Sequence, residues 1–261
     1  MVISRIPFLA ALLALCTAGT VGTVGKASAA DISVLTAGAF RPVLDALAPS
    51  IERTAGVHLI ITNGTAGELA KRIQNGEAFD VAILPEPVAK ALGASGHLAP
   101  PLSSIARVGI GVAVPEGAPR PDISTVEQFR QTLLAAPSVA YLDPAAGGSS
   151  GMYLSKLFET LGIAQAIAPK AVLVHGGLVG TRLVDGSAAL AVHQISELLA
   201  VPRIQYVGPL PAAVQNYTVY AAGVSPHAKN PADAQTLIQA LHGKEAAALL
   251  ERKGMEPAAP R

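Results

Sequence analysis

The sequence predicts an α/β fold, and three observations support this. Short runs of β-branched and apolar residues alternate with stretches in which apolar residues recur at helical spacing. Several of the predicted strands end in a turn of small residues that opens directly into a helix. Apolar residues make up 51% of the 261 residues and Trp is absent, so the core must consist mainly of Ala, Val, Leu and Ile. The length suits two modest α/β lobes or one larger domain.

Residues 1–29 have the pattern of an export signal. Arg5 supplies the positive start, residues 6–18 the apolar stretch, and small residues precede a predicted cleavage site between Ala29 and Ala30. The apolar stretch is shorter than the roughly 20 residues that a membrane span needs. An uncleaved anchor is the alternative. Cleavage predicts an exported, periplasmic protein.

Composition excludes several kinds of function. Cys16 is the only cysteine and lies within the predicted signal, so the exported chain would have neither a disulfide nor a thiol nucleophile. The formal net charge is +1 and no basic run occurs, which argues against a nucleic-acid partner. No two histidines stand four residues apart with acidic neighbours. We therefore expect neither a metal site nor a cofactor.

The first strand-to-helix unit contains the first candidate ligand site. Residues 32–35 form the strand, Gly38 and Ala39 lie in the turn, and Pro42 suits the first turn of the helix. Free backbone N–H groups at such a helix start attract an anion. The alternative is an ordinary connection without a ligand. Arg41 either pairs with a ligand carboxylate or faces solvent, and both interpretations stay open.

A second unit repeats this arrangement. Residues 57–62 form a strand, Thr65 and Ala66 lie in the turn, and a helix follows over residues 69–75. Thr65 and Glu68 have the spacing of a capping box, a role compatible with a ligand site.

The middle of the chain contains a carboxylate and two candidate crossings. Asp80 begins the strand at residues 79–84, and we expect it to accept local hydrogen bonds rather than to act in catalysis. Glycines interrupt the strand predicted over residues 107–114, which is a candidate crossing into a second lobe. Residues 217–224 form the candidate return strand.

Two further turns add polar groups. A strand at residues 139–142 runs into a glycine-serine loop with Ser149 and Ser150, which lacks the Gly-Lys-Ser/Thr ending of a nucleotide phosphate loop. Gly177 lies in a small-residue turn expected to open a helix over residues 178–184. His193 and Gln194 end another strand, where ligands bind in α/β sheets. A lone histidine is more often structural, so Gln194 is the stronger ligand candidate.

The order and spacing of these motifs resemble the periplasmic binding proteins of the molybdate-binding type. The resemblance covers almost all of the predicted exported chain. Its motifs are the turn at residues 35–40, Asn63-Gly64-Thr65-Ala66-Gly67-Glu68, the strand at 79–83, Asp143-Pro144 with its loop, Gly151-Met152-Tyr153, and residues 249–254.

The resemblance implies a type II periplasmic binding protein, with two Rossmann-like lobes joined by a two-strand hinge. Lobe 1 would comprise residues 30–110 and 206–261, and lobe 2 residues 111–205. A ligand would be trapped between the lobes by hinge closure. Molybdate binders of this type have a serine where this chain has Ala39, a run of serines near Ala66, and often a tyrosine at the position of Gln194. Fewer hydroxyl donors weaken the prediction of molybdate.

Two functions follow from this resemblance. The first is a non-enzymatic, monomeric solute-binding protein that delivers a small organic acid or oxyanion to the membrane permease of an ABC-type importer. Its ligand would contact Gly38, Ala39, Arg41, Thr65, Ala66, Ser149, Ser150, Gly177 and Gln194. The alternative is an exported isomerase similar to the aconitate isomerases, which resemble the same superfamily. Proton transfer there requires a base, an acid and cationic groups that hold the substrate carboxylates. The available residues of these types are Arg41, Arg107, Tyr153, His175 and His193.

Overall fold

The computed structural model describes residues 1–2 and 30–258. The predicted export signal falls almost wholly on residues 3–29, which lie outside the described residues, as do residues 259–261. None of the described helices is long and apolar enough to cross a membrane.

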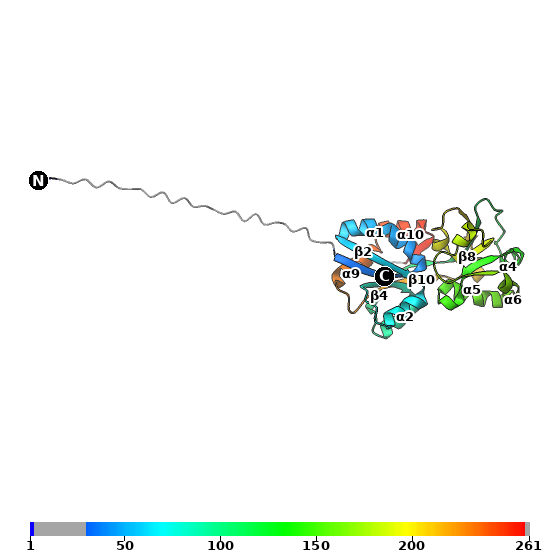
Figure 1. Ribbon diagram of the computed structural model, residues 1–261, viewed down its shortest axis with the longest axis horizontal. Coiled ribbons are helices and arrows are strands. Elements are labelled where there is room, and N and C mark those ends of the chain that lie inside the picture. The colour runs from blue at the N-terminus through cyan, green and yellow to red at the C-terminus, as the bar shows by residue number, and fades with distance from the viewer. Residues whose placement is uncertain (3–29, 259–261) are drawn as a thin grey trace.

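Two lobes lie side by side, as Figure 1 shows. The first lobe contains a six-stranded sheet in the order β11-β4-β10-β3-β1-β2, in which β1 pairs in parallel with β2 and β3, and β10 runs antiparallel to β3 and β4. Its strands are β1 Ala30–Ala37, β2 Val57–Gly64, β3 Val81–Pro85, β4 Ala99–Val108, β10 Thr218–Val224 and β11 Met255–Pro257. Its helices are η1 Gly38–Phe40, α1 Arg41–Ala55, α2 Ala66–Gln74, α3 Glu86–Ala94, α9 Pro231–Ala240 and α10 Lys244–Arg252. Both ends of the described sequence 30–258 thus contribute to this lobe.

The second lobe contains a five-stranded sheet in the order β7-β6-β8-β5-β9. Its strands are β5 Ile110–Pro115, β6 Val139–Leu142, β7 Ala171–Val174, β8 Leu190–Gln194 and β9 Ile204–Pro209. Its α-helices are α4 Val126–Ala135, α5 Ser149–Thr160, α6 Ala164–Ile167, α7 Thr181–Val184 and α8 Ile195–Leu198. Short 3₁₀ helices η2 Pro144–Ala146, η3 Ala168–Lys170 and η4 Ala212–Val214 connect some of these elements. The prediction of a two-lobed α/β fold is confirmed.

The chain passes between the two sheets at Gly109 and returns along residues 210–217. The single strand expected over residues 107–114 is therefore two strands, β4 and β5, because the backbone changes sheet between them. Gln215 ties the two crossings together. Its Oε1 accepts from the Ile110 N–H at 2.8 Å, and its Nε2 donates to the Ile110 carbonyl at 2.9 Å.

Each lobe has its own apolar core. In α1 the residues expected to face the core, Val43, Leu44, Leu47 and Ile51, are all buried, which confirms their helical spacing. Phe129 of α4 is fully buried at the centre of the second core. Aliphatic side chains dominate both cores, as the composition predicts.

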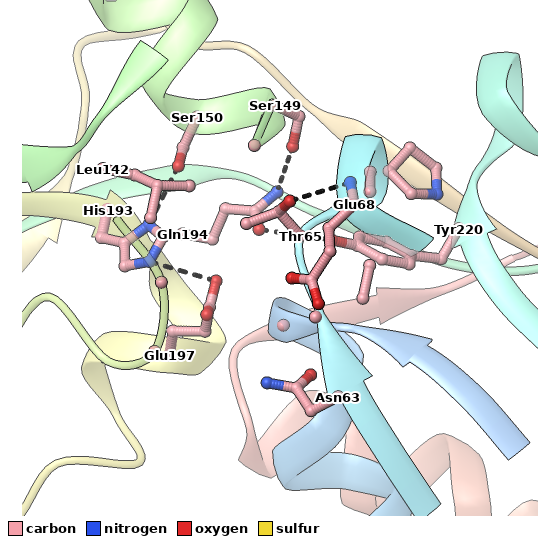
Figure 2. A pocket seen from close by; sticks show the side chains of 18 residues that line it. Asn63, Thr65, Glu68, Leu142, Ser149, Ser150, His193, Gln194, Glu197 and Tyr220 are labelled. Carbon is pink, nitrogen blue, oxygen red and sulfur yellow. Dashed lines mark hydrogen bonds and ion pairs between the residues drawn. The ribbon is translucent and has the colours of Figure 1, made fainter. Parts of the chain in front are cut away.

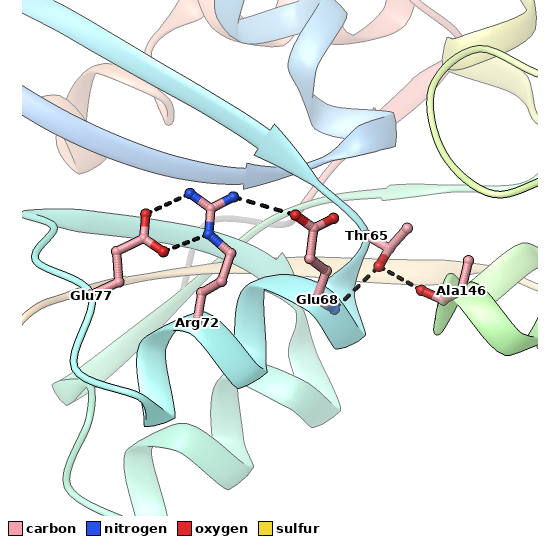
Figure 3. Close-up of polar contacts among 5 residues, drawn as sticks. All are labelled: Thr65, Glu68, Arg72, Glu77 and Ala146. Carbon is pink, nitrogen blue, oxygen red and sulfur yellow. Dashed lines mark hydrogen bonds and ion pairs between the residues drawn. The ribbon is translucent and has the colours of Figure 1, made fainter.

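The lobes also touch directly, on both sides of the space between them. Thr65 Oγ1 donates to the Ala146 carbonyl at 2.6 Å (Figure 3), and the Gly67 N–H donates to the Gly147 carbonyl at 3.2 Å. A Cβ added at Gly67 would lie 3.2 Å from Gly147 Cα, so this approach favours glycine at both positions. We call these two bonds the interlobe latch.

Asp80 connects distant parts of the first lobe. Its carboxylate is 3% exposed, and it accepts hydrogen bonds from the Ser33 N–H at 2.8 Å, the Ser33 hydroxyl at 2.9 Å and the Lys229 N–H at 2.8 Å. Asp80 thus holds β1 against the segment that leads into α9. The expectation of a structural hydrogen-bond acceptor is confirmed.

We predict that Asp80→Ala lowers the free energy of unfolding by about 2–4 kcal/mol, because it leaves three buried or half-buried donors without their charged acceptor. Urea unfolding followed by circular dichroism measures this loss. The control is Asp31→Ala, since the Asp31 side chain is 65% exposed and, among the described residues, pairs only with His58. That change should cost no more than about 0.5 kcal/mol. Equal losses in both variants would contradict the prediction.

We also predict that Thr65→Val lowers the free energy of unfolding by about 1–2 kcal/mol, because it removes both the cap of α2 and one bond of the interlobe latch. Thr65→Ser keeps the hydroxyl and should stay within about 0.5 kcal/mol of the wild type. The same urea titration compares the two variants. A serine variant as unstable as the valine variant would show that the hydroxyl is not the cause.

Candidate functional site

A cavity of about 160 Å³ lies between the lobes (Figure 2). The carboxyl ends of β1, β2 and β8 and the N-terminal ends of η1, α2 and α5 surround it. We call it the cleft. The strand ends and helix starts meet there because each parallel strand delivers its following loop to the same edge of its sheet.

Most of the residues predicted to bind a ligand line the cleft. They are Gly38, Thr65, Ala66, Ser149, Ser150, Gly177 and Gln194.

Ala39 and Arg41 do not line it. Ala39 is fully buried, and its carbonyl accepts a hydrogen bond from Ser196 Oγ at 2.7 Å. Arg41 lines an adjoining cavity, where its Nε donates to Asp45 Oδ1 at 2.6 Å, one turn along the same helix. The guanidinium is thus paired with a carboxylate of its own helix.

The N-termini of α2 and α5 lie at the wall of the cleft, although in α2 the N–H groups of Gly67 and Glu68 already donate to the Gly147 carbonyl and to Thr65 Oγ1. Thr65 caps α2, since its Oγ1 accepts from the Glu68 N–H at 3.2 Å, as the capping-box spacing predicts. The helix α5 begins at Ser149 after Gly148 and has no side-chain cap. Two opposed helix starts give the cleft a partial positive potential.

The prediction that a helix begins directly after Gly177 is wrong. The helix α7 begins only at Thr181, and Gly177 lies in a loop with a φ of +81°. Thr181 Oγ1 donates to the Leu178 carbonyl, so residues 178–180 form a turn before the helix. This fourth turn brings Gly177 to the wall of the cleft but supplies no helix start there.

A buried polar cluster lies on the wall of the cleft that the second lobe provides. His193 is 1% exposed, and its Nδ1 lies 3.0 Å from Ser150 Oγ. Its Nε2 lies 3.3 Å from Glu197 Oε2 but makes no well-aligned hydrogen bond. Glu197 is 5% exposed and also lines the cleft. A buried carboxylate beside a buried imidazole is an arrangement suited to proton transfer.

Sequence reasoning missed Glu197. It stands four residues after His193, but β8 ends between them and α8 begins, so helical spacing alone gives no signal. The feature that could have indicated it is an acidic residue in the first turn after a strand that ends in His-Gln. His193 itself lines the cleft, whereas the sequence favoured a purely structural role for it.

Tyr220 and Gln194 join the two lobes across the cleft. The Tyr220 hydroxyl donates to Gln194 Oε1 at 3.3 Å, and Gln194 Nε2 donates to Ser149 Oγ at 3.2 Å. Complete burial raises the pKa of the Tyr220 hydroxyl far above its usual value, and the nearby charge of Glu197 raises it further. Tyr220 therefore stays a protonated hydrogen-bond donor at physiological pH.

No lysine or arginine within the described residues lines the cleft. Its two carboxylates are Glu197 and Glu68, and Glu68 lies 3.4 Å from Arg72 (Figure 3). A hydrogen bond to Glu77 raises the pKa of Arg72, so this cation is permanent. Across residues 30–258 no group of three or more His, Cys, Asp or Glu side chains is arranged to hold a metal ion.

The other groups considered for proton transfer lie outside the cleft. Arg107 pairs with Glu256 and lies over the ring of Tyr217, 4.5 Å from its centroid. Tyr153 donates to the Val214 carbonyl at 2.7 Å. The His175 side chain is 84% exposed. Of the five groups considered, His193 alone contributes to the wall of the cleft.

Known proteins share both sequence and fold with this chain. The model of the family described as bacterial extracellular solute-binding protein matches residues 32–256. An aconitate isomerase from Pseudomonas sp is 35% identical over 237 residues, which is 87% of each chain. The periplasmic molybdate-binding protein of Azotobacter vinelandii has the same fold, with a TM-score of 0.72 at 19% identity over 88% of this chain and 100% of the other. The sulfate-binding protein SubI of Mycobacterium tuberculosis H37Rv gives a TM-score of 0.70 at 16% identity, over 88% of both chains. The chain belongs to the family of bacterial extracellular solute-binding proteins.

Proposed function

We propose that this protein is an exported isomerase that shifts a proton and a double bond within a small tricarboxylate of the aconitate type. The observation that carries the proposal is the buried pair of His193 and Glu197 on the wall of a cleft between two lobes. The 35% identity to an aconitate isomerase, over most of both chains, supports it.

The reaction needs one base and no further reagent. A base removes a proton from the methylene carbon beside the double bond, and the electron pair spreads over the allylic system and its carboxylates. The proton then returns to the other end of the allylic system, where the C–H bond forms as the double bond moves. Because the carbon skeleton of aconitate is symmetric, the product is again aconitate, with a newly set double-bond geometry.

Glu197 is the proposed base. Its carboxylate lines the cleft, and His193 Nε2 lies 3.3 Å behind it, where it can share the proton that Glu197 receives. Ser150 fixes the imidazole through Nδ1 at 3.0 Å. Charge that develops on the substrate carboxylates would meet the N-termini of α2 and α5 and the hydroxyl of Tyr220.

The second candidate is a non-enzymatic solute-binding protein. The family description and the shared fold with molybdate- and sulfate-binding proteins favour it. Such a protein would act as a periplasmic monomer, exported through the signal predicted at residues 1–29, and would deliver its ligand to an ABC-type permease. The ligand would contact the predicted residues that line the cleft, and no bond would be made or broken. In both candidates the ligand is a small anion.

We predict that the exported protein converts cis-aconitate into trans-aconitate, and proton NMR measures this conversion. Glu197→Gln should lower kcat at least about 100-fold, because it removes the base. The control is His175→Gln, whose imidazole is exposed and outside the cleft, and which should stay within twofold of wild type. A wild-type protein that is stabilised by aconitate in a thermal melt but shows no conversion would instead support the solute-binding candidate.

A further inference from the structure

Glu197 stands where the first strand-to-helix turn would otherwise receive an anion. A Cβ added at Gly38 would lie 2.5 Å from Glu197 Oε1, so the carboxylate fills the space against this turn. The chain thus places a negative charge of its own beside the helix start that precedes α1.

Ser196, the residue before Glu197, holds this part of α8 in place. Ser196 is fully buried, and its hydroxyl donates to the Ala39 carbonyl at 2.7 Å. This bond attaches α8 to the first lobe at the same turn. The bond therefore holds the backbone of Glu197 close to Gly38.

The groups that face Glu197 leave its charge only weakly compensated. From β8, His193 Nε2 approaches to 3.3 Å without a well-aligned hydrogen bond. From β10, Tyr220 contributes a neutral hydroxyl. From α1, Arg41 lines the adjoining cavity together with Glu197 but is paired with Asp45.

Two more charged groups lie around the cleft. From α2, Glu68 lines the cleft, and Arg72 compensates its charge. In the second lobe, Asp143 Oδ2 lies 2.9 Å from His175 Nδ1, and neither side chain lines the cleft. Glu197 is therefore the carboxylate in the cleft wall that lacks a permanent cation as its partner.

We propose that Glu197 determines the class of ligand that the cleft accepts. It rejects oxyanions of strong acids, such as sulfate, and it admits carboxylate ligands that share a proton with it. Two carboxyl groups at close range retain one proton between them, because both cannot stay ionised in a buried site. Sulfate is too weak a base to take part in such a shared hydrogen bond near neutral pH. The proposal rests on the cleft being the ligand site of the proposed function and concerns binding, not turnover. To act as the base in the proposed isomerisation, Glu197 would first have to pass the shared proton to His193.

The test is isothermal titration calorimetry at pH 7.5 in two buffers that differ in their enthalpy of ionisation. The probes are tricarballylate, a saturated tricarboxylate that cannot isomerise, and sulfate. We expect tricarballylate to bind the wild type with uptake of up to one proton beyond what the ligand's own titration supplies. Glu197→Gln should lose this extra uptake and should bind sulfate at least tenfold more tightly than the wild type does.

Two controls accompany the comparison. Glu68→Gln removes the other carboxylate of the cleft, and it should keep the proton uptake and the rejection of sulfate, because Arg72 already compensates that charge. If Glu197→Gln does not fold, the wild type alone decides: its affinity for tricarballylate should fall up to tenfold per pH unit between pH 7 and 8, and sulfate should bind at least tenfold more weakly than tricarballylate.

Three results would overturn the proposal. They are equal sulfate affinity in the wild type and Glu197→Gln, tricarballylate binding without extra proton uptake, and no binding of either probe between pH 5 and 8. The NMR assay of aconitate conversion tests the proposed isomerase separately from the proposed role of Glu197 in ligand selection. Proton-coupled binding without aconitate conversion would remove the isomerase and leave the role of Glu197. Aconitate conversion by a wild-type protein that also binds sulfate tightly would support the isomerase and overturn the role of Glu197 in ligand selection.

Discussion

Within residues 30–258 the backbone joins the two lobes at two neighbouring crossings, at Gly109 and along residues 210–217. The cleft lies between the two sheets that these crossings connect. Gln215 ties the crossings together through Ile110. The contacts that hold them closed are non-covalent and include the interlobe latch, the bond from Ser196 to Ala39, the bond from Tyr220 to Gln194 and the packing of Ile195 against the first core. A ligand in the cleft would add its own contacts to these.

The electrostatics of the cleft combine two opposed tendencies. Helix starts at α2 and α5 favour an anion, and they do so with backbone groups rather than with lysine or arginine side chains. Glu197 disfavours an anion, because it places a buried carboxylate on the wall of the same cleft. Such a site suits a ligand with several carboxylates, some directed at the helix starts and one near Glu197. A small, symmetric oxyanion would have to meet all of these groups at once.

The sequence predicted the fold well because its signals are local. Turns of small residues after apolar strands, the cap at Thr65 and the helical spacing in α1 each depend on residues close together in the chain. The positions of seven of the nine predicted ligand residues at the cleft follow from the same rule, since strand ends and helix starts meet at one edge of each sheet. Ala39 and Arg41 belong to the first such turn. The contact of Ala39 was not predictable, because Ser196 is far away in sequence, whereas the pair of Arg41 and Asp45 has the i,i+4 spacing of a helix, a local signal that sequence reasoning did not use.

Glu197 illustrates the opposite case. The only local signal is its place just after a strand that ends in His-Gln. Its significance comes from two parts of the chain that meet only in the folded state: β8 and α8 with His193, and the turn at Gly38 and Ala39, to which Ser196 anchors α8. Where these parts meet, Glu197 and His193 are almost fully buried. In the proposed isomerase this burial would also keep water away from the base, so that the cleft which would retain a solute in a binding protein would serve proton transfer instead.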